Sequence, residues 1–80
     1  MVIHLIKGQF PGSDAISIIT QMIDIKIKFQ EAKIESSHNE EDIKMRENRI
    51  KALQKELHDA RKLIHTHGDR ISLHSEIYLE

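Results

Sequence analysis

Two apolar stripes run side by side along residues 13–36. The first repeats at alternating steps of three and four residues, as in a coiled-coil seam, through Ala15, Ile18, Met22, Ile25, Phe29 and Ala32. The second consists of Ile16, Ile19, Ile23, Ile27 and Ile34. A helix that is apolar on two sides has to be covered on both, and the chain contains only one other long helical segment. We therefore expect part of this surface to pack against a second copy of the chain or against another protein.

The alternation of apolar and polar residues over 23–29 is also compatible with a strand. We favour a helix because the helical period holds over more than twenty residues and no turn residue interrupts it. Gly8, Pro11 and Gly12 precede this helix and end a short apolar opening. Ser13 is then the expected N-cap, since its hydroxyl can accept a bond from a free backbone N–H.

A second helix is predicted after the break at residues 36–39. Asn39 is a strong N-cap residue, and three acidic residues follow it in the first turn, where the helix dipole favours negative charge. Its apolar seam is Ile43, Ile50, Leu53, Leu57, Ala60 and Ile64. Arg46 occupies one seam position, where we expect its stem to lie along the interface and its guanidinium to reach water. Gly68 suits the stop after His65 or His67.

The ends of the chain are β-prone. Residues 71–79 alternate with a period of two, and residues 2–6 are rich in β-branched residues. The short connection makes helices at about 13–36 and 40–67 antiparallel neighbours, so both end segments meet at the open end of the hairpin. The predicted fold is therefore mainly α, an antiparallel two-helix hairpin whose short terminal segments can pair as strands in the order β-α-α-β.

The chain has 80 residues and no cysteine, which indicates one small domain, 1–80, without disulfides. Leu79-Glu80 is a pair that expression vectors often leave before a tag, so these two residues carry little weight. A core this small is marginal, and we expect a homodimeric four-helix bundle, with a monomer as the alternative. The expected interface residues are Ile16, Ile18, Ile19, Met22, Ile23, Ile25, Phe29 and Ile34.

Charge is balanced, with 12 basic and 13 acidic residues and a formal net charge of −1. Such a chain has no broad field for nucleic acid or an anionic membrane, and no apolar run is long enough to span a bilayer. We expect no signal peptide either, since the apolar opening is short and ends at Gly8. We therefore expect a cytoplasmic protein without a membrane partner. The basic residues of the second helix are interleaved with acidic ones: Lys44, Arg46, Arg49, Lys51, Lys55, Arg61 and Lys62.

Histidines are the candidate metal ligands, namely His58, His65, His67 and His74. The chain lacks the paired spacings of known zinc motifs, and histidines near a helix C-terminus also interact favourably with the dipole. We expect solvated or capping histidines, no bound metal and no cofactor. The serines lack a nucleophile elbow and the acidic residues lie on charged helix faces, so no enzyme is expected.

The sequence thus predicts a small non-enzymatic interaction or structural module that self-associates through its first helix, or that binds a helical protein partner. The alternative is a regulatory nucleic-acid-associated protein that uses the basic residues of the second helix.

Overall fold

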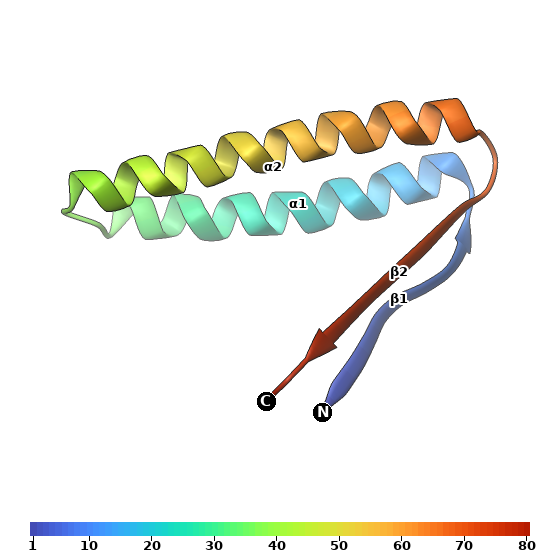
Figure 1. Cartoon of the computed structure of the whole chain (residues 1–80), viewed down its shortest axis with the longest axis horizontal. Helices are drawn as coiled ribbons and strands as arrows, with labels where there is room; N and C mark the ends of the chain where they lie inside the picture. The colour runs from blue at the N-terminus through green and yellow to red at the C-terminus, as the bar shows by residue number, and fades with distance from the viewer.

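The computed structural model describes all residues, 1–80, in the order β1 (Val2–Phe10), α1 (Gly12–Glu35), α2 (Glu40–His67) and β2 (Ile71–Tyr78). The helices form a hairpin, and the strands form an antiparallel ribbon that leaves the open end of that hairpin at an angle (Figure 1). The helices hold 24 and 28 residues, so the chain is mainly α, as predicted. Both helices begin and end within one residue of the expected bounds. Neither helix combines the length and the hydropathy needed to cross a lipid bilayer.

The start of α2 follows the sequence prediction. The side-chain oxygen of Asn39 accepts bonds from the backbone N–H groups of Glu41, at 2.9 Å, and of Asp42, at 3.3 Å. The predicted cap of α1 is wrong, because the helix begins one residue before Ser13 and no side chain caps it. Pro11 occupies the N-cap position instead, and its carbonyl accepts the first helical bond from the N–H of Ala15 at 2.9 Å.

The start of α1 and the end of α2 lie against each other, and each carries a glycine there. Gly68 ends α2 with a φ of 79°, a conformation that other residues rarely adopt, and its N–H bonds the carbonyl of Ile64 at 3.1 Å. Gly12 lies against Gly68 at the first residue of α1. β1 therefore joins the hairpin at the same point where β2 leaves it, which brings the two strands together.

The strands pair antiparallel, and Leu79 extends the pairing through reciprocal bonds with Met1. β1 continues to Phe10, so Gly8 lies inside the strand and does not end it as we expected. The terminal strands are accordingly longer than the short segments predicted. The register runs from Val2 opposite Tyr78 to Phe10 opposite Ile71, with an irregularity between His4 and Ile6.

Very little of this arrangement is buried. Only Ala15, Leu53 and Ile64 lie in the core. The molecule is flat, since it measures 13 Å along its shortest axis against 45 Å and 32 Å along the other two. Its radius of gyration is 15.1 Å, against about 12 Å for a compact chain of this length. The four elements thus lie side by side in little more than one layer (Figure 1), whereas stable domains pack two.

Candidate functional site

The two apolar stripes of α1 face different neighbours. Arg61 and Arg46 of α2 donate hydrogen bonds to Thr20 Oγ1 at 3.3 Å and to Gln30 Oε1 at 2.8 Å, which marks the side of α1 that faces α2. At 100° per residue, four isoleucines of the second stripe fall on this same side: Ile16, Ile23, Ile27 and Ile34. All four are half-buried, so α2 covers most of the second stripe, while Ile19 and Ile23 also border the cavity beside the ribbon.

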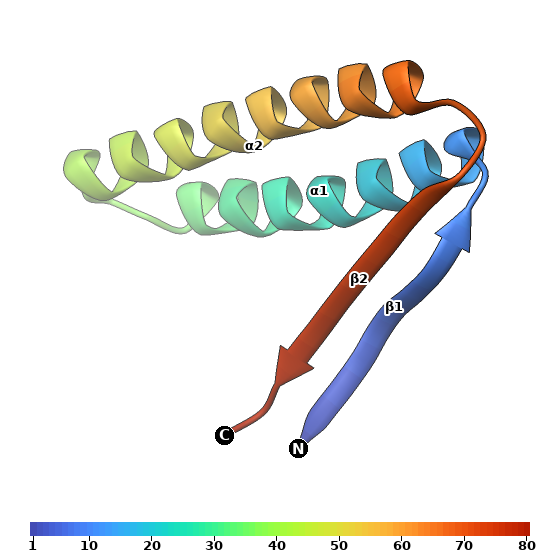
Figure 2. The same cartoon turned by 45° about the vertical axis from the view of Figure 1, so that its right-hand side comes forward.

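The coiled-coil stripe of α1 faces the ribbon over part of its length only. Ile18 and Met22 line an apolar cavity of about 270 Å³ together with Ile6 of β1 and Leu73 of β2. This cavity lies in the wedge between α1 and the ribbon, which open away from each other like the arms of a V (Figure 2). The ribbon covers this stripe incompletely, since it contacts α1 sparsely and diverges from it along the chain.

Farther along the same stripe the side chains are open to solvent. Ile25 is 69% exposed and Phe29 is 57% exposed. The ammonium group of Lys33 lies over the Phe29 ring, 5.6 Å from its centre. Of the eight expected interface residues, the other six are half-buried within the single chain: Ile16, Ile18, Ile19, Met22, Ile23 and Ile34. The exposed pair therefore marks the part of α1 that nothing in this chain covers.

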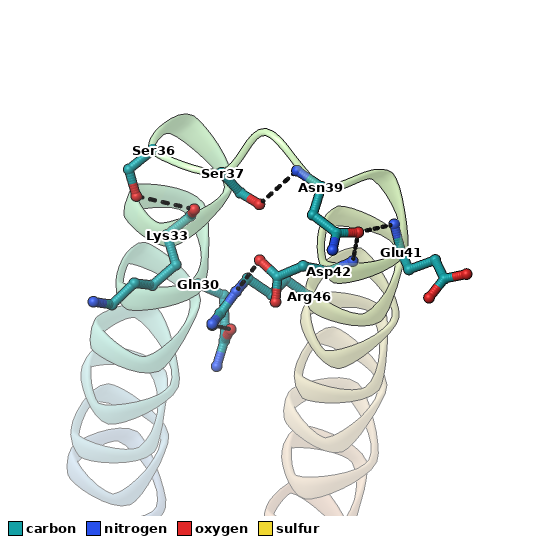
Figure 3. A network of polar contacts seen from close by, with 8 residues as sticks. All are labelled: Gln30, Lys33, Ser36, Ser37, Asn39, Glu41, Asp42 and Arg46. Carbon is teal, nitrogen blue, oxygen red and sulfur yellow. Dashed lines mark hydrogen bonds and ion pairs between the residues drawn. The ribbon is translucent and has the colours of Figure 1, made fainter.

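The closed end of the hairpin is held by polar contacts (Figure 3). Arg46 Nε donates to Asp42 Oδ2 at 3.1 Å while the same guanidinium bonds Gln30, and its side chain is only 19% exposed. The guanidinium, which we expected to reach water, thus lies part-buried and bonds Gln30 across the interface between α1 and α2. The Arg46 hydrogen bond, aided by the Ser37 hydroxyl, lowers the pKa of Asp42.

Other basic residues of α2 lie on its exposed side, in part among acidic neighbours. Lys55 pairs with Asp59 at 3.1 Å, one turn away. Arg61 is exposed and reaches Thr20 of α1. The side chains of the remaining four form no hydrogen bond or ion pair, and these residues are exposed: Lys44, Arg49, Lys51 and Lys62. No continuous basic surface free of acidic side chains follows from this arrangement.

The structure separates the candidate histidines. His58, His65 and His67 lie exposed on α2, and His67 Nδ1 lies 2.9 Å from the carbonyl of Leu63. His74 lies on β2 beside His4 and Glu76, two residues that sequence reasoning missed. The period-two pattern of β2 places His74 and Glu76 on one face, but His4 joins them only through the pairing of β1 with β2.

Comparison with protein-family models, with curated proteins and with solved structures found no match. The functional proposal accordingly rests on the open apolar stripe and on the geometry of this chain.

Proposed function

We propose that the protein is a non-enzymatic, self-associating structural or interaction module in which two copies pack through α1 into a four-helix bundle. The observation that carries this proposal is the uncovered part of the coiled-coil stripe, at Ile25 and Phe29.

The solvent-accessible area of the chain is large enough to include an interface with a partner protein. The chain exposes 6328 Å², whereas a compact monomer of 9.3 kDa exposes about 5,000 Å². The excess, on the order of 1,300 Å², is larger than the ~800 Å² that each partner contributes to a standard interface. A second copy is the partner always present at the same concentration as the chain itself, and it supplies the missing second layer.

The exposed side chains supply the driving force. Fully burying one large apolar side chain stabilises an assembly by about 1.5–3 kcal/mol. Ile25 and Phe29 stand one turn apart on the same side of α1, so one partner helix can cover both. In a twofold dimer the same stripe contacts itself, so each favourable contact occurs twice. Ile18 and Met22 continue the stripe into the V, where the second copy would also cover the cavity.

The test is the mass of the protein in solution, by sedimentation equilibrium or light scattering. We expect twice the 9.3 kDa mass of the chain. Ile25→Asp should return a folded particle of the single-chain mass, because a carboxylate would be buried without a partner in the dimer yet lies in water in the monomer. Ser17→Asp is the matched control, since it adds the same charge at an exposed position of α1 that belongs to neither apolar stripe and should leave the dimer intact.

Two results would contradict the proposal. The first is a wild-type protein that keeps the single-chain mass at millimolar concentration. The second is an Ile25→Asp variant that remains dimeric with an unchanged circular dichroism spectrum.

A further inference from the structure

A cluster of metal-ligating side chains lies on the ribbon, and one of its members, His74, also borders the apolar cavity. Alternation along β2 places His74 and Glu76 on one face of the ribbon and Leu73 and Ser75 on the other, although His74 also reaches the edge of the cavity that Leu73 and Ser75 line. His4 lies directly opposite Glu76 in the register, so it shares this face. His4 and Glu76 do not line the cavity, so the cluster adjoins the surface proposed for self-association at His74 alone.

The three ligand atoms converge on one point. Glu76 Oε1 lies 2.8 Å from His74 Nε2 and 3.3 Å from His4 Nδ1, and all three atoms lie within 4.8 Å of one another. A tetrahedral zinc site with bonds of about 2.0–2.1 Å places neighbouring ligand atoms roughly 3.3 Å apart. The His4–Glu76 separation already has this value. The shorter His74–Glu76 separation is a hydrogen bond, and it has only to lengthen by about half an ångström when both atoms bind a metal instead.

A neighbouring group fixes the carboxylate in the orientation that a metal needs. The hydroxyl of Tyr78 donates a 2.6 Å hydrogen bond to Oε2 of Glu76, which leaves Oε1 directed at the two imidazoles. Partners of this kind orient the ligands and raise metal affinity in natural sites.

We propose that His4 Nδ1, His74 Nε2 and Glu76 Oε1 bind one Zn²⁺ ion per chain, with water completing the tetrahedron. The ligands come from both strands, so the ion joins β1 to β2 near the free end of the ribbon. A two-stranded ribbon is barely stable alone, and a metal that binds only the paired strands stabilises the pairing. Zinc thus cross-links the two strands of a domain that has no disulfide.

The experiment is titration of the full chain, without a polyhistidine tag, with ZnCl₂ in a non-chelating buffer, followed by calorimetry. We expect one Zn²⁺ per chain and a higher melting temperature at equimolar zinc. His4→Ala, His74→Ala and Glu76→Gln should each weaken binding by about tenfold or more, and Tyr78→Phe should weaken it by less without changing the stoichiometry. His58→Ala and His65→Ala are the matched controls, because they remove exposed histidines elsewhere, and they should bind as the wild type does.

A second measurement locates the ion without relying on variants. In ¹⁵N-correlated spectra of the imidazoles, zinc should shift the signals of His4 and His74 and leave those of the helical histidines in place. The proposal is overturned if equimolar zinc changes neither heat nor melting temperature. It is equally overturned if binding survives in both His4→Ala and His74→Ala, or if the shifted signals belong to α2.

Discussion

The carbonyl oxygen of Gly68 lies so close to Gly12 that a Cβ atom on Gly12 would stand 2.8 Å from it. The first residue of α1 and the C-cap of α2 thus meet backbone to backbone, at the point where both strands leave the hairpin. Real Cβ atoms essentially never approach another heavy atom this closely, and the obstacle here is backbone rather than a flexible side chain.

Gly12→Ala should therefore destabilise the fold, by about 1–3 kcal/mol, because the helix ends must move apart to admit the methyl group. Helix propensity alone predicts the opposite sign, since alanine is the better helix former. Urea unfolding monitored by circular dichroism distinguishes the two. Ser13→Ala, at the next residue, is the control and should stay within about 0.5 kcal/mol of wild type. An unchanged midpoint for Gly12→Ala would mean that the close approach is relaxed in solution.

Asn39→Ala should cost about 1 kcal/mol, because two backbone N–H groups at the start of α2 lose their acceptor. Asn39→Asp keeps an acceptor oxygen at the same place and should retain most of this stability. Denaturant midpoints of the two variants provide the comparison. Equal losses in both would show that the side chain does not act as a cap.

The ion pair between Asp42 and Arg46 predicts a dependence of stability on acid pH. The bond from Arg46 lowers the pKa of Asp42 below its ordinary value of 3.8 in the folded chain, so the unfolded chain protonates first as the pH falls. The stabilisation is complete above about pH 5 and disappears as the pH falls through the folded pKa. The unfolding free energy of Asp42→Asn should consequently fall less than that of the wild type between about pH 5 and pH 2.

Arg46→Met is the partner variant in this test, because it removes the group that lowers the pKa. It should remove most of the same pH-dependent loss of stability, and adding Asp42→Asn should remove only the smaller part that comes from the Ser37 hydroxyl. Additive effects on the slope would contradict a direct coupling of Asp42 to Arg46.

Self-association also predicts a melting temperature that depends on protein concentration, independently of any variant. Mass action stabilises a dimer as the chain becomes more concentrated. For a dimer of two such chains we expect a rise of roughly 4 °C per tenfold increase in concentration. Scanning calorimetry over two decades of concentration measures this. A melting temperature that stays constant over that range would indicate a monomer.

The elements themselves were predictable from local spacing. The period of the apolar residues predicted both helices within a residue of their bounds, and Asn39 and Gly68 marked the start and the end of α2 correctly. Pairing of the two terminal strands followed from the hairpin, because antiparallel helices bring both ends of the chain to one place.

The details that depend on neighbours were not predictable in this way. Pro11, and not Ser13, is the N-cap of α1. β1 runs through Gly8 because pairing with β2 supplies hydrogen bonds that outweigh the local turn signal. Arg46 is held by Gln30, sixteen residues earlier in the chain, through the particular rotation of α1 against α2.

Helical and strand periods, caps and stops depend on residues a few positions apart, so these features are already determined by the amino-acid order. The exposure of Ile25 and Phe29 and the meeting of His4 with His74 and Glu76 depend on rotation, register and one irregularity in the ribbon. Only the tertiary structure decides these, because strands that meet from opposite ends of a chain can pair in several registers, and a shift of one residue turns every side chain to the other face.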